Sequence, residues 1–117
     1  MKDFAGLFAG GLANLQQQSK ARLGDKTLMD ALIPAVEALQ AQSAHTQDIL
    51  VALRAGAQAA RAGSNATATL VAHFGRAKYQ GERTLGKLDP GSVSMAYFFE
   101  GLLAGLEKQI STPSTPI

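Results

Sequence analysis

The residues best suited to chemistry in this chain are the cations and glycines between Phe74 and Ser92. This stretch shows no helical spacing of apolar side chains. It contains four glycines and four cations: Gly75, Gly81, Gly86 and Gly91, with Arg76, Lys78, Arg83 and Lys87. Glycine lets a ligand approach the backbone closely, and arginine suits phosphate oxygens. Loops longer than about 12–15 residues are uncommon in compact domains and are usually functional or disordered.

The stretch ends in Asp89-Pro90-Gly91, and we expect a helix to start immediately after it. Helix N-termini bind anions because their first amides are unpaired and the helix dipole is positive there. A cationic loop that leads into a helix start therefore predicts phosphate binding. The alternative is an ordinary solvated crossing, since Asp-Pro-Gly is also a common turn signal. Residue types alone do not separate the two interpretations.

A second candidate for ligand binding is Gly24-Asp25-Lys26-Thr27, which resembles the end of a phosphate-binding P-loop. It lacks the first glycine of that motif and the preceding strand, so it is not a P-loop. Thr27 followed by Asp30 resembles a capping box, with Asp in place of the usual Glu or Gln. The segment therefore predicts a helix start that could face a ligand.

The composition excludes several other kinds of site. There are no cysteines, which rules out disulfides, thiolate zinc sites and cysteine nucleophiles. His45 and His73 have no metal-ligand spacing, so we expect structural or solvated roles for both. The net charge of +2 is too weak a bias to predict nucleic acid as a partner. With no apolar run of about 18 residues and no signal peptide, we expect no membrane span and a cytoplasmic location.

The elements that would position these residues are helices, and the predicted fold class is all-α. Apolar spacing of three and four residues marks four helical stretches: Phe4, Leu7, Phe8, Leu12 and Leu15; Leu28, Leu32, Val36 and Leu39, with a kink expected at Pro34; Ile49, Leu50 and Leu53, beginning near His45; and Met95, Phe99, Leu102, Leu103, Leu106 and Ile110. The third stretch becomes rich in alanine, which favours close approach of a neighbouring helix. Gly63 is a candidate interruption, after which Ala66, Leu70 and Phe74 resume the spacing. The tail 111–117 is expected to be disordered.

Two segments carry a family resemblance. Residues 24–34, GDKTLMDALIP, resemble the "GDKTMLDAL-P" signature of the L subunit, or L domain, of dihydroxyacetone (glycerone) kinases. Residues 75–86, GRAKYQGERTLG, followed by DPGS at 89–92, resemble the "GRASYLGERSIGH-DPGA" segment of the same family. Both motifs are long, and they occur in the family's order at about the right distance. The resemblance extends from about Phe4 to Ile110, so residues 1–110 resemble the C-terminal part of that domain.

The resemblance implies an antiparallel barrel of eight helices with ADP or ATP bound at one rim, of which this chain would form about half. It also implies that phosphate passes to dihydroxyacetone held by a histidine of a separate K-type subunit, with a phosphotransferase-system M-type subunit as a further candidate partner. The positions that match nucleotide-binding residues of the family are Gly24, Ile33, Arg76, Asp89, Pro90 and Gly91. Arginine suits phosphate, whereas Asp89 is better suited to accept hydrogen bonds from sugar hydroxyls or loop amides.

The sequence departs from the family's pattern in two respects. Lys78 and Lys87 stand where the family commonly has Ser and His, and Gln80 replaces an apolar residue, so the loop carries more charge. In the family, three closely spaced aspartates in an N-terminal segment bind magnesium, and we expect this sequence to begin after that segment, since it shows no such cluster. Phosphoryl transfer depends on cations that bridge the phosphates. We therefore expect that the chain alone is not a competent kinase.

Half a barrel would leave apolar inner stripes, such as Leu102 and Leu106, in contact with water. We therefore expect the chain to self-associate, to pair with the missing N-terminal half, or to close into a smaller bundle. Three functions follow for comparison: the nucleotide-binding part of a glycerone kinase, a non-catalytic helical interaction or scaffold protein derived from that domain, and a small RNA-contacting protein. The small net charge disfavours RNA binding, and so does the scarcity of aromatic side chains in the loop, where Tyr79 is the only one.

Overall fold

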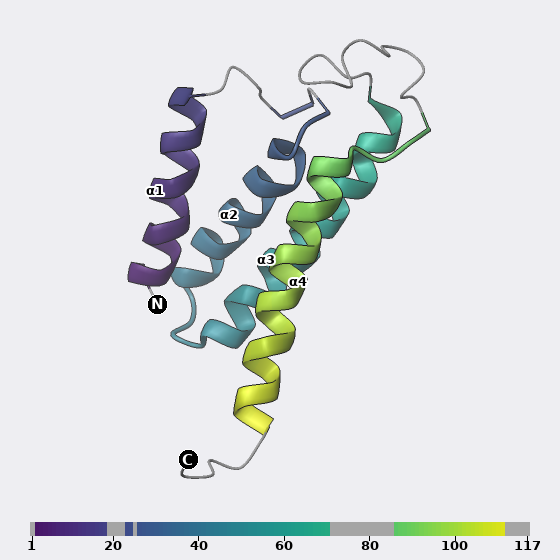
Figure 1. Cartoon of the computed structure of the whole chain (residues 1–117). Helices are drawn as coiled ribbons and strands as arrows, with labels where there is room; N and C mark the ends of the chain where they lie inside the picture. Colours follow the sequence, from purple (N-terminus) through teal and green to yellow (C-terminus); the bar gives the residue numbers. More distant parts are fainter. Residues whose placement is uncertain (1, 19–22, 25, 71–85, 112–117) are drawn as a thin grey trace.

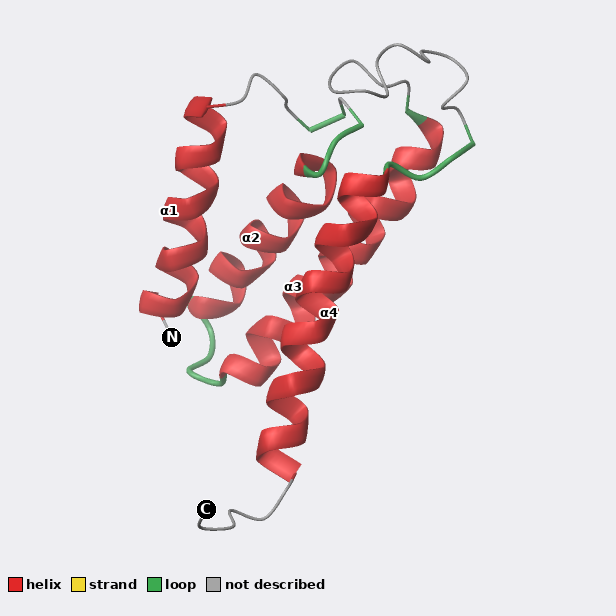
Figure 2. Cartoon of the chain, in the orientation of Figure 1, coloured by secondary structure: helices red, strands yellow, loops and turns green. Residues whose placement is uncertain are grey.

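The computed structural model describes residues 2–18, 23–24, 26–70 and 86–111 of the chain. These residues form four α-helices and one short 3-10 helix, with no strand among them (Figure 2). The elements are α1 (Lys2–Gln18), α2 (Met29–Ser43), α3 (Ile49–Ala66), η1 (Thr67–Thr69) and α4 (Pro90–Ser111). The all-α prediction is confirmed. The tail residues 112–117 lie outside the described residues.

Successive helices run in opposite directions, so the four form an antiparallel bundle (Figure 1). The second helix packs against the third, the third also packs against α4, and α1 lies against α2 at one side. The start of α2, the end of α3 with η1, and the start of α4 all lie at the same end of the bundle. The described residues of the two motif segments therefore lie at that end, although they are far apart in the sequence.

The core lies where α2, α3 and α4 meet, and small side chains allow the close packing. The buried apolar residues of these helices are Met29, Ala31, Leu32, Ala35, Val36, Leu39, Ala52, Leu53, Ala57, Ala60, Ala96 and Phe99. A methyl group added at Gly56 would come 3.2 Å from the Cγ atom of Leu39, which shows how closely α3 approaches α2. The predicted stripe of α2 is confirmed for Leu32, Val36 and Leu39.

Several apolar residues predicted for inner faces are exposed. Leu7 is 73% exposed and Leu15 is also exposed, because α1 sits at the edge of the bundle and packs through a narrow face. That face consists of buried Ala5 with partly buried Phe4, Phe8, Ala9 and Leu12. Leu28 precedes α2 and is exposed as well. The Leu7, Leu15 and Leu28 parts of the predicted stripes are therefore wrong.

The third helix differs from its predicted bounds at both ends. It begins at Ile49 because Asp48, with an extended backbone, accepts a hydrogen bond from the Leu50 amide at 3.0 Å and so caps the helix. His45 lies before this cap and is exposed. The helix runs through Gly63 without interruption and ends at Ala66. Leu70 is extended (φ −104°, ψ 155°), so the helical spacing that predicted it is misleading, and Phe74 lies outside the described residues.

The apolar face of α4 is only partly covered. Phe99 is buried, and Met95, Leu103 and Leu106 pack against the core, whereas Leu102 and Ile110 are exposed. A groove of about 500 Å³ lies between the first turns of α1 and α3 and the second half of α4. The bundle therefore does not cover the whole inner stripe, as expected for Leu102. None of the described helices is long and apolar enough to cross a membrane.

Candidate functional site

The turn before α2 is organised by the carboxylate of Asp30. Its Oδ1 accepts a hydrogen bond from the Gly24 amide (2.6 Å), and its Oδ2 accepts one from the Thr27 amide (2.9 Å). Gly24 has φ +95°, a conformation that glycine adopts without steric cost. The Thr27 hydroxyl accepts from the Met29 amide (3.1 Å). Of the two hydrogen bonds of the predicted capping box, the one from the Thr27 amide to the Asp30 carboxylate is confirmed. The other differs, because the Thr27 hydroxyl accepts from the Met29 amide and not from the Asp30 amide.

Lys26 extends from this turn into the protein. Its side chain is only 2% exposed, and its Nζ donates hydrogen bonds to the carbonyl oxygen of Leu70 (3.0 Å) and to that of Lys87. Burial lowers the pKa of Lys26, and the nearby carboxylate of Asp89 opposes that change. One ammonium group thus joins the turn before α2, the residue after η1 and the residues before α4.

Asp89 caps α4, which begins at Pro90. Proline suits the first helical position because its missing N–H would be unpaired there in any case. Oδ2 of Asp89 accepts from the Ser92 amide (2.8 Å), and its backbone oxygen accepts from the Val93 amide (3.0 Å). Burial raises the pKa of Asp89, and the hydrogen bond from Ser92 opposes that rise.

This cap changes the expectation for the start of α4. The helix begins at Pro90, and the Ser92 and Val93 amides already bond to Asp89, so they are not free to bind a phosphate. These two amides are paired within the chain, and phosphate binding by the loop and this helix start stays a prediction. Asp89 accepts from a main-chain amide, but the donor Ser92 lies in α4. The expected hydrogen bonds from sugar hydroxyls or loop amides therefore stay a prediction.

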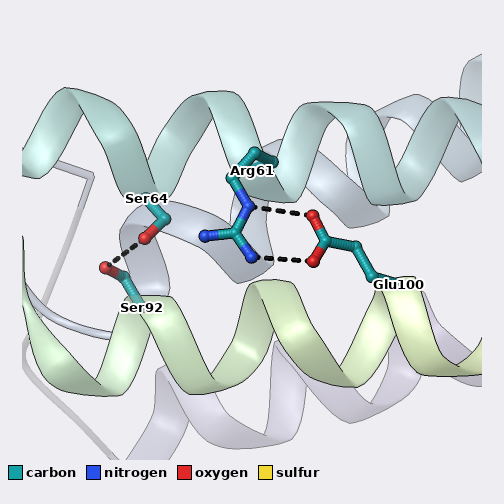
Figure 3. Close-up of polar contacts among 4 residues, drawn as sticks. All are labelled: Arg61, Ser64, Ser92 and Glu100. Atoms are coloured by element: carbon teal, nitrogen blue, oxygen red, sulfur yellow. Dashed lines mark hydrogen bonds and ion pairs between the residues drawn. The ribbon is translucent and has the colours of Figure 1, made fainter.

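Buried hydroxyl groups fix the start of α4 against the end of α3. The Thr67 hydroxyl donates to the Ser64 carbonyl oxygen (2.6 Å) and accepts from the Asp89 amide (2.8 Å). The hydroxyls of Ser64 and Ser92 are hydrogen-bonded at 3.0 Å across the two helices (Figure 3). Because the Ser92 hydroxyl donates to the Asp89 carbonyl oxygen (2.8 Å), Ser64 is the donor in the serine pair. Isolated hydroxyls have no spacing signal, so the sequence did not reveal this network.

Farther along the same pair of helices, Arg61 and Glu100 form a two-pronged ion pair (Figure 3). Nε and Nη2 of Arg61 donate to the two carboxylate oxygens at 2.8 and 2.7 Å. The guanidinium also lies 4.9 Å from the centre of the Tyr97 ring. The hydrogen bonds from Arg61 lower the pKa of Glu100. This pair aligns α4 along α3 and so helps to hold the Asp89 cap in place.

The structure brings together three of the six predicted nucleotide-binding positions, namely Gly24, Asp89 and Gly91. A methyl group on Gly91 would lie 3.2 Å from Oδ2 of Asp89 and 3.4 Å from Cβ of Leu28, so the start of α4 touches the turn before α2. Asp30, which binds the Gly24 amide, is close enough to Asp89 to raise its pKa. Described residues of both motif segments therefore belong to one polar cluster.

The other three predicted positions have different surroundings. Pro90 is exposed, between the two residues of the cluster. Ile33 is partly buried and packs against the core from the first half of α2. Arg76 lies outside the described residues, as does His73.

The family model of the DAK2 domain matches residues 1–104 of the chain. The chain belongs to the DAK2 domain family. It is 40% identical over 108 residues to the "PEP-dependent dihydroxyacetone kinase 2, ADP-binding subunit DhaL" of Listeria innocua, an alignment that covers 92% of this chain and 50% of that protein. It is 36% identical over 96 residues to the corresponding PEP-dependent subunit of Escherichia coli K12, covering 82% and 46% of the two chains.

The "PTS-dependent dihydroxyacetone kinase, ADP-binding subunit DhaL" of Lactococcus lactis is 37% identical over 101 residues, covering 86% of this chain and 47% of that protein. The chain thus spans about half the length of the curated relatives that it matches. The resemblance that the two motifs indicated is confirmed, and the antiparallel helical bundle agrees with it.

Two cavities of this DAK2-domain chain lie away from the polar cluster. One is the apolar groove beside Leu102, and the other, of about 550 Å³, lies between α3 and α4 and is lined by Arg54, Ala57, Gln58, Arg61, Ala62, Asn65, Glu100 and Leu103. Neither is lined by Gly24, Asp89 or Gly91.

The described residues also do not fit a magnesium site. Among them, no three His, Cys, Asp or Glu side chains are grouped so that they could hold a metal ion. Asp30 and Asp89 already accept main-chain hydrogen bonds, which fixes their carboxylates as caps. What this part of the DAK2 domain offers is a hydrogen-bonded backbone frame, with open space where a Cβ at Gly24 would lie.

Proposed function

We propose that this chain is the nucleotide-binding part of a dihydroxyacetone kinase L domain, formed by residues 1–110, with 111–117 as a tail. The observation that supports it most is the polar cluster of Gly24, Asp89 and Gly91 at one end of the bundle. The relatives are named as ADP-binding subunits, so ADP or ATP is the proposed ligand. In the proposal, Ile33 and Arg76 complete the nucleotide-binding set.

The surroundings of Gly24 and Asp89 support a role for each of them, and the residue type of Arg76 suggests a third role. The backbone of Gly24 borders open space, so a nucleotide can approach it closely. Asp89 holds the backbone of Pro90 and Gly91 in position because its carboxylate caps Ser92. Phosphate binding falls to Arg76, whose guanidinium suits two phosphate oxygens at once.

For the intact domain, we propose that phosphate passes from the nucleotide to dihydroxyacetone held on a K-type subunit. A phosphotransferase-system M-type subunit is a further proposed partner, since relatives are named as PEP-dependent and PTS-dependent. The magnesium site that the family resemblance implies has no counterpart among the described residues. We therefore propose that this chain alone binds nucleotide without transferring phosphate.

The alternative is a non-catalytic helical interaction protein derived from the same domain. Exposed apolar side chains on α4, namely Tyr97, Phe98 and Leu102, favour it. In a purified sample only a second copy of the chain could cover them, so self-association predicts a mass above the 12.2 kDa of one chain. A monomer of that mass in analytical ultracentrifugation would contradict self-association.

Titration with ADP tests the proposed function. We expect ADP to raise the Tm of the wild-type chain, since a ligand at 100 times its Kd stabilises the fold by about 2.7 kcal/mol. Arg76→Ala should weaken ADP binding by about tenfold or more, because it removes a charge-assisted phosphate contact. Arg54→Ala is the matched control, because that side chain is half exposed and its ion pair with Glu107 is long at 3.8 Å. If ADP leaves the wild-type Tm unchanged, the interaction protein becomes the better explanation.

A further inference from the structure

We infer that Lys26 is a positioning residue that fixes the backbone of the nucleotide site and does not itself bind phosphate. This inference rests on the proposed function. The segment around Lys26 resembles the end of a P-loop, in which the lysine reaches the phosphates. Here the side chain is buried, and its ammonium group donates to two main-chain carbonyls.

The two carbonyls belong to Leu70 and Lys87, which lie on either side of residues 71–85. The segments that contain these two carbonyls are also joined by a main-chain hydrogen bond from the Gly86 amide to the Ala68 carbonyl oxygen (2.6 Å). Asp89 follows two residues after Lys87. The ammonium group of Lys26 therefore sets where the chain enters α4, and with it the position of the Asp89 cap.

The backbone at Lys26 is strained in a way that supports this role. Its φ is +60°, in the left-handed region that non-glycine residues rarely adopt and that costs roughly 1–2 kcal/mol. The Asp30 carboxylate holds the turn from both sides of Lys26, through the amides of Gly24 and Thr27. This frame aims the lysine inward, which is unnecessary for a side chain that reaches a ligand in solvent.

Burial of an ammonium group is unfavourable unless it is hydrogen-bonded and near an opposite charge. Lys26 meets both conditions through the two carbonyls and the neighbouring Asp89 carboxylate. An apolar side chain of similar length would remove the donor from Leu70 and Lys87, and both carbonyls lie in the connection that leads to Asp89. We expect the effect to reach the nucleotide through the backbone.

Two ligands distinguish a positioning residue from a phosphate ligand. Loss of a side chain that contacts phosphate weakens the binding of ADP but not that of adenosine, whereas a displaced backbone weakens the binding of both. We therefore expect Lys26→Met to raise the Kd for ADP and for adenosine by a similar factor, about tenfold. Lys108 is an exposed lysine in the last turn of α4, so Lys108→Met is the control and should leave the Kd values for ADP and adenosine unchanged.

Amide hydrogen exchange provides a second reading that needs no ligand. In Lys26→Met, exchange at the Gly86 and Asp89 amides should accelerate about tenfold or more, while Val36 and Ala57 in the core keep wild-type rates. If the variant does not fold, the wild-type chain with ¹⁵N-labelled lysine still decides. The Nζ signal of a buried, positioning Lys26 should be protected from exchange without ADP and should shift little when ADP is added.

The inference is overturned if Lys26→Met weakens ADP alone and leaves adenosine and the Gly86 and Asp89 amides unaffected. A large ADP-induced shift of the Lys26 Nζ signal would overturn it as well. Failure of the proposed function looks different: the wild-type chain would bind neither ligand. Amide exchange at Gly86 and Asp89 would then still show whether Lys26 holds these segments.

Discussion

The carbonyl oxygen of Asp30 in α2 lies close against the backbone of Gly63 in α3. A methyl group at position 63 would overlap this oxygen and come 3.3 Å from the Cα of Ala31. The oxygen is open to this approach because the residue four positions later is Pro34, which has no N–H to donate to it. Proline on one helix and glycine on the other thus let two backbones meet, with a Cα–H···O contact between them.

Gly63→Ala should therefore destabilise the chain. The added methyl group must push α2 and α3 apart at their closest point, at a cost of about 1–3 kcal/mol in the free energy of unfolding. That cost should exceed the gain of up to about 1 kcal/mol from alanine's higher helix propensity. Urea denaturation followed by circular dichroism measures the difference. Gly101→Ala is the control, because open space surrounds that position and only the stabilising gain is expected.

Thr67→Val should also destabilise the fold, because it removes a hydrogen bond while the packing stays nearly the same. Valine has nearly the same shape but leaves the buried Asp89 amide without the acceptor that it has in the wild type. An unsatisfied buried amide costs about 1–3 kcal/mol. Thr69→Val removes a similar hydroxyl at an exposed site, so a change within about 0.5 kcal/mol is expected there. Equal effects of the two variants in urea denaturation would contradict the bridging role of Thr67.

A double-mutant cycle should detect coupling between Arg61 and Glu100. Their two short hydrogen bonds and partial burial favour a coupling energy of about 0.5–1 kcal/mol at neutral pH. Because Arg61 lowers the pKa of Glu100, this contribution is present above the usual range of a Glu carboxyl and is lost as the pH falls through the lowered pKa. Arg54 and Glu107, at 3.8 Å and about half exposed, should show almost none.

The helices could be predicted wherever a buried face consists of large aliphatic side chains. Leu32, Val36 and Leu39 of α2 are such a case. The same reasoning failed for Leu7 and Leu15, since spacing identifies an apolar face but not how many neighbours will cover it. It also failed for Leu70, where hydrogen bonds at the end of α3 turn the chain into η1.

The two motifs located the candidate site, but the contacts that build it are tertiary. Gly63 reads as a helix interruption because glycine lowers helix propensity, while its actual role is a close approach to α2 that spacing cannot show. From the sequence, the segment around Lys26 predicts only a helix start that could face a ligand. The burial of Lys26 depends on Leu70 and Lys87, whose approach to one another only the folded chain determines.

Asp89→Asn should change how stability depends on pH. Burial raises the pKa of Asp89, so at this carboxyl the folded chain binds a proton more readily than the unfolded chain. The stabilising contribution is therefore complete below the usual pKa of about 3.9 and is lost as the pH rises through the raised pKa. Asparagine does not titrate, and its amide oxygen can still accept from the Ser92 amide.

As the pH rises from about 4 through the raised pKa of Asp89, the free energy of unfolding of Asp89→Asn should thus rise relative to that of the wild type. The slope with pH carries the test, because removal of a negative charge beside Lys26 adds an offset to the absolute difference. Asp89→Ala separates titration from capping: it should share the slope but lie lower by about 1 kcal/mol, since the cap is gone. Urea denaturation at several pH values measures both variants. If the free energies of unfolding of Asp89→Asn and the wild type changed in parallel with pH, the buried carboxylate at the start of α4 would not destabilise the fold.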